Sequence, residues 1–595
     1  MIALAPPRAL SPLTALATLV AAETLRVAGT GAWTGAGALV PLLVCAVAAL
    51  GGPLVWWLGS RAALPVALTA AAVARLAVQV PAARVPAVTA VAAGVAVAAL
   101  LLTVRRLDPA RAARAVALGA GADLALRLPS AGLGPVWSGG VTGWTVALLS
   151  AAALAGGAEL LRRRPPAAPE RPVGVLGTAL VGPALALYGA FLASPALLAA
   201  RGGLAWDTAG LWLATGTVLA MAALARPLPA WERLASPAAL LVATAVFLLV
   251  PTWPAAPAAL VALTALPLVL RGALGIALPA ADRLGPWGAQ AAAGALAALG
   301  YTVLVLPHAL GLLPALLPLL AVAGLGWAAL RGAAGGPLGG TFRTVVLAAV
   351  LLAVPPLAGA LRGTVDAPPT DTAGGMYRLL TWNVHQAVDR DGQVDPRAVL
   401  TVLEDARADV VVLQEVPRGT AAAGGLDLRT WLERRLGATG VWAPAGDRTT
   451  GTLLLTALPV VAADTGTLPG GERSHAVVDV RLAEGETARV VTAHTDGDTE
   501  QMAALVRALG DDPHAVLAGD LNAEPGSAAV EALLAAGLHS AQDGDQDLAG
   551  RDTAVDPDRR VDWVFGGRDV AFGGVRLDRT DASDHLPLSV TVFLD

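Results

Sequence analysis

Ala515-Val-Leu-Ala-Gly-Asp-Leu-Asn522 is a short apolar run that ends in two polar residues, Asp520 and Asn522. An apolar run of this length, bounded by turn-forming residues, is typical of a buried β-strand. A carboxylate and an amide that follow a buried strand lie at the edge of a sheet, where side chains from other strands can join them. The same pattern recurs through the last third of the 595-residue chain.

Five other segments place polar residues at or just after an expected strand. They are Thr381-Trp-Asn383, Gln414-Glu415, Ala493-His-Thr-Asp496, Val561-Asp-Trp563 and Ser583-Asp-His-Leu-Pro587. Strands are expected at 378–383, 410–413, 453–455, 476–480, 489–493, 515–518, 562–565 and 588–593, with helices at 396–406 and 428–436. This alternation over residues 377–595 predicts one layered α/β domain.

The six motifs, in this order, resemble those of the endonuclease/exonuclease/phosphatase superfamily. This superfamily of metal-dependent phosphodiesterases includes DNase I-like nucleases, inositol phosphatases and neutral sphingomyelinases. The resemblance spans almost the whole of residues 377–595, and it implies a DNase I-like four-layer α/β sandwich.

The resemblance also implies a metal site. It makes Glu415 the principal ligand, with Asn383 in support and Asp584 as a second carboxylate on the metal side. Hard oxygen ligands of this kind suit Mg²⁺, with Mn²⁺ as the alternative.

The remaining motif residues are implied to carry the chemistry on the phosphate. Asp520 orients or deprotonates the attacking water, and Asn522 binds a phosphate oxygen. His585 contacts the scissile phosphate, and Asp562 fixes its tautomer and raises its basicity. His494 stabilises the charge of the transition state or the leaving group.

Each assignment has a structural alternative. Asp520 and Asn522 could cap a helix that begins near Ser527, and Asp584 could belong to a turn. His385 is left open because it lies two residues beyond Asn383, where some relatives carry a metal-side acid. We expect the other histidines of this part to be surface or structural residues: His475, His514 and His539.

The first 362 residues have a different composition. The whole chain is 55% hydrophobic and 14% charged, which excludes a single soluble globule. About thirteen apolar runs are long enough to cross a bilayer as helices. They lie near 10–28, 36–58, 62–80, 85–104, 110–128, 141–161, 173–200, 205–225, 236–253, 257–277, 288–307, 309–330 and 343–361. The chain therefore divides into a polytopic α-helical membrane domain at 1–362, a Pro/Gly-rich linker at 363–376 and a catalytic domain at 377–595.

Arginine positions predict the orientation. Arginines gather in the N-terminus and the even-numbered loops, as in Arg105-Arg106 and Arg162-Arg163-Arg164, whereas the odd-numbered loops hold isolated residues such as Arg84. Positive residues favour the cytoplasmic side. We therefore expect an integral protein of a bacterial plasma membrane, with a cytoplasmic N-terminus, a retained first span and an extracytoplasmic catalytic domain.

Several ionisable residues fall within the expected spans. Glu23 with Arg26, and Asp123 with Arg127, have the spacing of pairs on one helix face. We favour such local ion pairs over a lipid-headgroup or transport site, although charged residues in spans are costly and are often functional.

Charge and a narrower resemblance restrict the substrate. Residues 376–595 hold 19 Arg and 35 acidic residues, a net charge of −16, which disfavours nucleic acid as a partner.

The segments 383–395 and 424–437 are similar to the C-terminal domain of fungal GPI-lipid-remodelling proteins and of bacterial multi-span proteins. The stretch Thr450–Ala457 departs from the family pattern, because it lacks an Asn and an Arg that relatives carry. The substrate specificity and the activity of the domain therefore need a test.

The sequence thus predicts a membrane-anchored, metal-dependent phosphodiesterase. Its expected partner is the lipid bilayer, and its expected substrate is a phospholipid or glycolipid headgroup on the extracytoplasmic side. Two alternatives stay open: an extracytoplasmic nuclease, and a catalytically silent binding module that regulates a transporter or lipid-handling membrane core.

Overall fold

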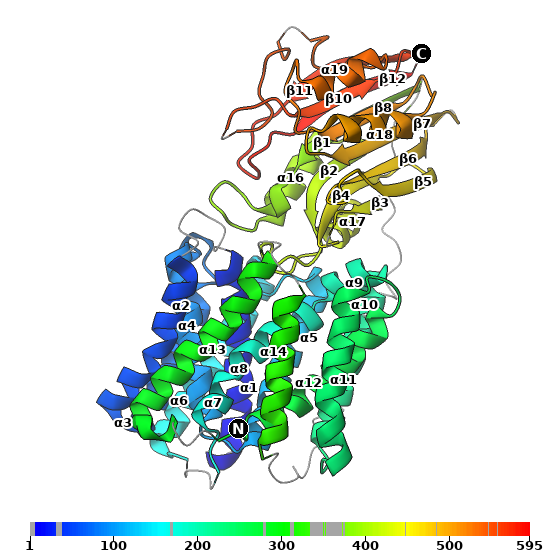
Figure 1. Ribbon diagram of the computed structural model, residues 1–595. Helices are drawn as coiled ribbons and strands as arrows, with labels where there is room; N and C mark the ends of the chain where they lie inside the picture. Colours follow the sequence, from blue (N-terminus) through cyan, green and yellow to red (C-terminus); the bar gives the residue numbers. More distant parts are fainter. Residues whose placement is uncertain are drawn as a thin grey trace. The chain divides into compact units, whose positions relative to one another are not determined.

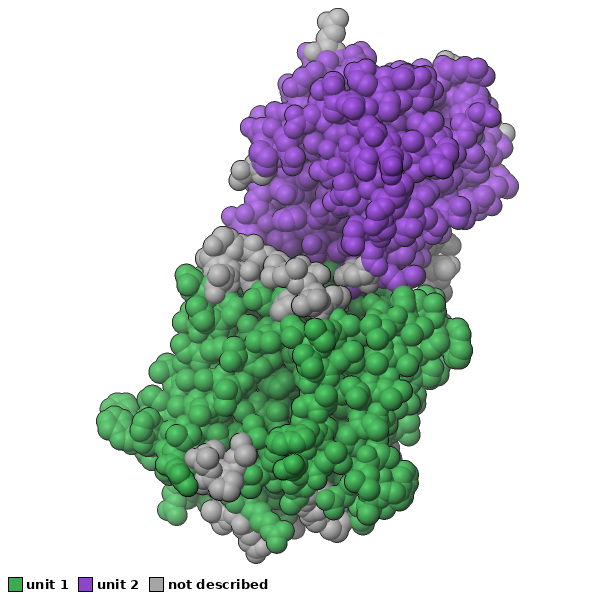
Figure 2. Space-filling view, in the orientation of Figure 1, with its two compact units in different colours: residues 1–362, 419–425 green, residues 363–418, 426–595 purple. Residues whose placement is uncertain are grey.

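The computed structural model describes residues 6–30, 39–166, 171–277, 281–309, 315–333 and 375–594, except 447, 484, 546 and 556, together with 345, 349, 352 and 372. The chain forms two compact units (Figure 2). The first unit comprises residues 1–362 and 419–425, and the second comprises 363–418 and 426–595. Most of the expected linker and of the expected span at 343–361 lies outside the described residues.

The first unit is built from helices (Figure 1). They are α1 (Pro6–Thr30), α2 (Leu39–Ala49), α3 (Gly51–Ala77), α4 (Pro86–Val104), α5 (Pro109–Arg127), α6 (Gly140–Arg163), α7 (Val175–Ala179), α8 (Val181–Ala186), α9 (Pro195–Gly202), α10 (Trp206–Leu224), α11 (Ala230–Leu249), α12 (Ala255–Ala273), α13 (Gly285–Ala309) and α14 (Leu316–Arg331). A π-helix over Leu187–Leu192 follows α8.

Nine stretches among the described residues are long and apolar enough to cross a membrane. The expected spans at 36–58 and 62–80 form one such stretch, Leu39–Ala77, which is interrupted at Gly59 by a non-helical backbone conformation. Helix α14 is apolar but has only 16 residues. The helical character of this unit is confirmed, whereas the count of thirteen spans is not.

Small residues let these helices approach closely. A β-carbon at Gly119 of α5 would lie 2.1 Å from the carbonyl oxygen of Ala15 in α1, and one at Gly294 of α13 would lie 2.2 Å from that of Ala48 in α2. Packing through small residues is typical of helices in membranes. Lipid tails are as apolar as the side chains there, so helices associate through close van der Waals contact and not through the hydrophobic effect.

The second unit contains two six-stranded sheets. The first has the order β11-β12-β1-β2-β4-β3, and the second has the order β5-β6-β7-β8-β10-β9. The strands are β1 (Met376–Asn383), β2 (Val410–Pro417), β3 (Thr439–Pro444), β4 (Thr450–Thr456), β5 (Val460–Thr467), β6 (Ser474–Arg481), β7 (Thr487–His494), β8 (Val516–Asp520), β9 (His539–Ser540), β10 (Asp562–Gly566), β11 (Val570–Leu577) and β12 (Leu588–Leu594).

Alternate residues of the strands build the core between the sheets. Leu379, Val412 and Val590 of the first sheet share one buried cluster with Val478 and Val490 of the second, as the two-residue period of a strand requires. The outer face of the second sheet is covered by α18 (Thr499–Leu509) and α19 (Ala528–Ala535). Helix α17 (Leu428–Leu436) packs against β2 and β3 of the first sheet, and α16 (Pro396–Ala406) contacts α17.

The predicted α/β architecture is confirmed. Helices α16 and α17 begin and end at the residues expected, and all eight expected strands are present, most of them longer by one to four residues. The helix expected near Ser527 is α19, and the Ser527 hydroxyl caps it by accepting from the Val530 amide. Strands β3, β5, β9 and β11 and helix α18 were not predicted.

Candidate active site

Strand directions bring the polar motifs to one edge of each sheet. Strands β1 and β2 are parallel, as are β7 and β8, so the carboxyl ends of each pair coincide. In the second sheet His494 at the end of β7 is in register with Asp520 at the end of β8, and Asp520 is in register with Asp562 at the start of β10. Three motifs distant in sequence therefore meet through backbone register alone.

Asn383 links the two sheets. Its side-chain amide nitrogen donates to Glu415 Oε1 at 3.3 Å and to Asp520 Oδ2 at 2.9 Å. Its oxygen accepts the backbone N–H of His385 at 3.0 Å, which fixes the orientation of the amide. The nitrogen thus faces the carboxylates, and the role of Asn383 as a metal ligand stays a prediction.

Two site residues have a left-handed backbone. Glu415 has φ +53° and lies where the β2–β4 register shifts between Leu413 and Val416, which marks a bulge. Asn522 has φ +47°. Asparagine tolerates this conformation, whereas for glutamate it costs about 1–3 kcal/mol. Bulges commonly re-aim a side chain at an active site, and here the bulge carries the carboxylate next to Asn383.

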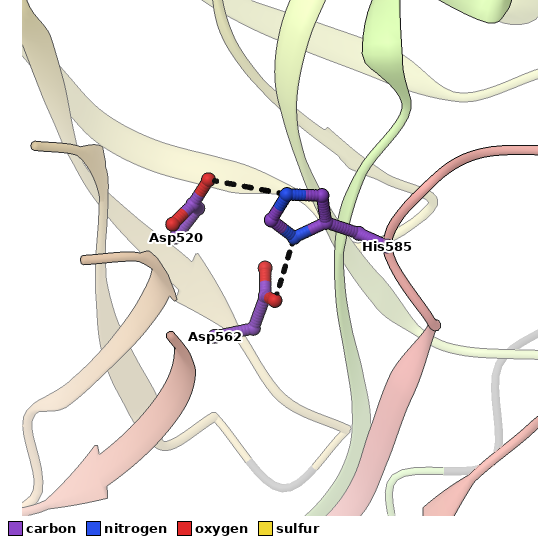
Figure 3. A group of neighbouring side chains, drawn as sticks. All are labelled: Asp520, Asp562 and His585. Atoms are coloured by element: carbon purple, nitrogen blue, oxygen red, sulfur yellow. Dashed lines mark hydrogen bonds and ion pairs between the residues drawn. The ribbon is translucent and has the colours of Figure 1, made fainter. Parts of the chain in front are cut away.

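Asp562 and His585 form a buried pair (Figure 3). His585 Nδ1 lies 2.8 Å from Asp562 Oδ2, and its Nε2 lies 3.9 Å from Asp520 Oδ2. Burial by itself lowers the pKa of His585, but the charge of Asp562 and its hydrogen bond raise that pKa to about 10. The ring is therefore a cation at neutral pH, held in place by one carboxylate and directed at another.

Both partners of this pair are fixed by further bonds. The backbone N–H of Asp562 donates to the Thr553 hydroxyl at 3.0 Å, and the Trp382 indole donates to the His585 carbonyl at 2.9 Å. These contacts leave the Asp562–His585 pair little freedom to reorient.

His494 lies on the other side of Asp520. Its Nε2 is 3.4 Å from Asp520 Oδ2 and 3.2 Å from the amide nitrogen of Asn522. Burial lowers the pKa of His494, against the opposing effect of the nearby carboxylates. The Arg473 guanidinium approaches the ring at 2.9 Å and also bonds Asp496 Oδ1 at 2.7 Å. His494 thus lies between the Arg473 cation and the Asp520 carboxylate.

Asp584 occupies the exposed rim of the site. Its side chain is 43% exposed and lies 3.7 Å from His385 Nδ1. The Ser583 hydroxyl donates to the Asn383 carbonyl at 2.7 Å and contacts Asp584 Oδ1 at 3.2 Å, which ties this rim to the end of β1. The structure therefore places seven of the eight predicted residues in one chain of direct contacts, with Asp584 beside it.

A cavity of about 420 Å³ adjoins this group. Glu415 and His494 line it on the side of the predicted residues, and Arg473, Glu472 and Gln386 line it elsewhere. Sequence reasoning did not single out Arg473, because only the pairing of β6 with β7 brings it to His494.

The site has the donors that a divalent cation requires. Asp520, Asp562 and His585 have possible ligand atoms within 4.8 Å of one another, and the two carboxylates are the members of this group open to a cation while His585 is protonated. Asp562 Oδ1 is buried and lacks a hydrogen-bond partner among the described residues. Burial alone would raise the pKa of Glu415, but His494, His385 and Asn383 lower it. The net effect is a lowered pKa, so the Glu415 carboxylate is ionised. Oxygen donors of this charge fit a metal such as Mg²⁺.

Comparison with known proteins gives one family match. Residues 380–585 match the model of the Endonuclease/Exonuclease/phosphatase family. No curated protein matches the chain.

Solved structures match a little over a third of the chain. An endonuclease/exonuclease/phosphatase from Beutenbergia cavernae is 24% identical, with 37% of this chain and 72% of that chain covered and a TM-score of 0.33. D. rerio TDP2 complexed with single strand DNA product is 16% identical, with coverages of 36% and 98% and a TM-score of 0.30. ANGEL2, a 2',3'-cyclic phosphatase, is 14% identical, with coverages of 36% and 95% and a TM-score of 0.32.

Proposed function

Because residues 380–585 form a domain of the Endonuclease/Exonuclease/phosphatase family, we propose that the chain is a membrane-associated, divalent-metal-dependent phosphodiesterase. Its proposed substrate is a lipid-linked or membrane-proximal phosphodiester on the extracytoplasmic side. The observation that carries the proposal is the contact chain in which Asn383 joins Glu415 to Asp520, and Asp520 lies between His494 and His585.

The attack on phosphorus is assigned to Asp520 and His585. Burial and the neighbouring charge of Asp562 raise the pKa of Asp520, which makes this carboxylate a stronger base. Asp520 accepts the proton of the attacking water, while the cationic His585 contacts a phosphate oxygen. Asp562 keeps the His585 ring charged and oriented through the 2.8 Å bond.

The opposite side of the phosphate is assigned to His494, Asn522 and Arg473. The Asn522 amide nitrogen donates to the Thr495 carbonyl at 2.9 Å as well as facing His494, so its position is fixed. These groups bind the non-bridging oxygens and stabilise the charge that grows on the leaving oxygen. A divalent cation held by Glu415 would neutralise phosphate charge and assist departure of the leaving oxygen.

Two features favour a membrane substrate. The nine apolar helices among the described residues support a position of the chain at a bilayer, which would limit its substrates to lipids and nearby solutes. The net charge of −16 on residues 376–595 repels polyanions and so disfavours nucleic acid.

The test uses the full-length protein in detergent micelles. Headgroup release from defined phospholipids, hydrolysis of bis(p-nitrophenyl) phosphate and cleavage of a DNA oligonucleotide are measured side by side with Mg²⁺. We expect lipid and model-diester turnover that EDTA abolishes. Asp520→Asn and His585→Gln should each lower kcat at least about 100-fold, the scale of a lost general base or charge stabiliser.

The matched controls are Asp511→Asn, which precedes β8 at the end opposite Asp520, and His539→Gln, which is in register with Gly566 at the end of β10 opposite Asp562. Both residues are exposed, and both variants should retain activity. Faster cleavage of DNA than of lipid would favour the nuclease. Metal binding without turnover of any substrate would favour the silent binding module. Undiminished turnover in the two site variants would contradict the assigned roles.

A further inference from the structure

A cavity inside the first unit is lined by charged and hydroxyl side chains. Arg26 comes from α1, Asp123 and Arg127 from α5, Ser194 from the N-cap of α9 and Tyr301 from α13. These helices are far apart in sequence, so the cavity is a product of the tertiary fold. The proposed phosphodiesterase reaction uses none of these residues.

The ion pairs leave this cavity with one excess positive charge. Asp123 pairs with Arg26 and, through Oδ2, with Arg127 Nε at 3.0 Å. Glu23 does not pair with Arg26, the alternative that its sequence spacing suggested, but with Arg75 of α3 at 2.7 Å. The Glu23–Arg75 pair is neutral by itself, so the cavity lining holds two guanidinium groups and a single carboxylate.

One guanidinium nitrogen of the cavity lacks an acceptor. Arg26 Nη1 is buried and has no hydrogen-bond partner among the described residues. Arg127, by contrast, is held through Nε by Asp123 and through Nη2 by the Ala193 carbonyl at 2.9 Å. A buried charged donor without an acceptor is unfavourable. An oxyanion in the cavity would supply the acceptor, and planar guanidinium groups bind phosphate oxygens in pairs.

The cavity lies near the ends of the helices that form it. Arg26 is four residues from the end of α1 at Thr30, and Arg127 is the last residue of α5. Tyr301 is five residues from Leu306, where the apolar stretch of α13 ends. With a rise of 1.5 Å per residue, these residues lie within about 8 Å of the helix ends. In a bilayer crossed by these helices, such positions are closer to the headgroup boundary than to the hydrocarbon centre.

Backbone from residues 419–425, which belong to the same unit, completes the lining. Gly419 and Gly425 have φ of +97° and +83°. A β-carbon at Gly419 would lie 2.7 Å from the Leu197 amide nitrogen, and one at Gly425 would lie 3.9 Å from Arg127 Nη1. Glycine therefore permits the close approach of the backbone at residue 419 to Leu197, and at residue 425 it permits the left-handed conformation beside Arg127.

We propose that this cavity is a binding site for a phosphate-type oxyanion. Arg26 contacts the phosphate oxygens through Nη1, Arg127 adds its positive charge, and the Tyr301 and Ser194 hydroxyls are neutral donors in the same lining. A phospholipid headgroup and free inorganic phosphate share this chemistry. The site is separate from the proposed catalytic residues and does not depend on their activity.

The test measures binding to the full-length protein in detergent micelles with EDTA, which stops metal-dependent hydrolysis. The probes are dioleoylphosphatidylglycerol, dioleoylglycerol without phosphate, and inorganic phosphate, with native mass spectrometry as the readout. We expect a phosphate-bearing probe to bind at least tenfold more tightly than dioleoylglycerol. Arg26→Gln should weaken that binding at least tenfold, whereas Arg162→Gln, which changes an exposed arginine paired with Glu159, should not.

A second variant keeps the test decisive if Arg26→Gln does not fold. Tyr301→Phe removes one neutral donor of the lining and keeps both ion pairs of Asp123, and we expect it to weaken binding at least threefold. Competition between the lipid and inorganic phosphate identifies the natural source of the oxyanion. The proposal is overturned if dioleoylglycerol binds as well as both phosphate probes, if folded Arg26→Gln binds normally, or if Tyr301→Phe binds normally.

Discussion

The charge of His585 depends on its Asp562 partner. Burial would lower the pKa of His585, yet the carboxylate at 2.8 Å raises it to about 10. Asp562→Asn keeps the shape of the side chain and removes its charge. We therefore expect the pKa of His585 in the metal-free protein to fall toward or below about 6.5, the ordinary value for histidine.

The consequence for stability has a definite sign. A pKa raised in the folded state means that the protonated ring stabilises the fold below the unfolded pKa of about 6.5, and this stabilisation is lost as the pH rises through about 10. Asp562→Asn should therefore be most destabilising at and below neutral pH. NMR titration of ¹⁵N-labelled histidine rings measures the shift, with His585→Gln to assign the signal. A pKa that stays near 10 in the variant would show that Asp562 is not its cause.

Residue identity was predictable at this site, whereas residue geometry was not. Asn383 and Asp520 could be found because each follows an apolar strand in a known order. The left-handed backbone of Glu415 depends on the β2–β4 bulge, and the contact of Arg473 with His494 depends on the β6–β7 pairing. Such features arise from partners distant in sequence, so no local pattern contains them.

Helix α17 begins at a buried carboxylate with two functions. Asp427 is fully buried; it accepts the Thr430 amide at 3.0 Å as N-cap and pairs with Arg418 Nη2 at 2.9 Å. Its loss removes a cap worth about 1 kcal/mol and leaves a buried guanidinium unpaired, which together cost about 3–5 kcal/mol. We expect Asp427→Ala to lower the melting temperature of the second unit by roughly 10 °C.

The control is an exposed cap in the same unit. Asp498 caps α18 by accepting the Glu500 amide at 2.9 Å. Asp498→Ala should cost only the cap, about 1 kcal/mol or a few degrees. Differential scanning fluorimetry of the full-length protein compares the two variants. Equal shifts would show that the Arg418 pair adds nothing to the cap.

At the element scale, sequence patterns were reliable where an element has a clear boundary signal. Helix α16 has Asp395 as N-cap and Pro396 in its first turn, and α17 ends at Gly437 in a left-handed conformation. Strand β5 gave no such signal, because most of its residues are exposed and it lies at the edge of the second sheet. An edge strand needs no apolar alternation to form, since its pairing with β6 supplies its hydrogen bonds.

For the whole molecule, the side of the membrane on which residues 376–595 lie follows from the arginine distribution. Arg162, Arg163 and Arg164 form the densest basic loop, and positive loops stay cytoplasmic. With the odd number of spans that we predict, we expect the C-terminal domain to be extracytoplasmic. Alkaline phosphatase fused after Asp595 should therefore be active, and green fluorescent protein fused there should be dark.

The internal control is a set of the same two fusions placed after Arg164. That loop should give the opposite pattern, fluorescent and without phosphatase activity, because it is predicted to face the cytoplasm. If green fluorescent protein is fluorescent both after Arg164 and after Asp595, the two positions lie on the same side of the membrane. The number of spans between them would then be even, whereas we predict an odd number. The catalytic site would then face cytoplasmic substrates, and the lipid headgroups available to it would be those of the inner leaflet.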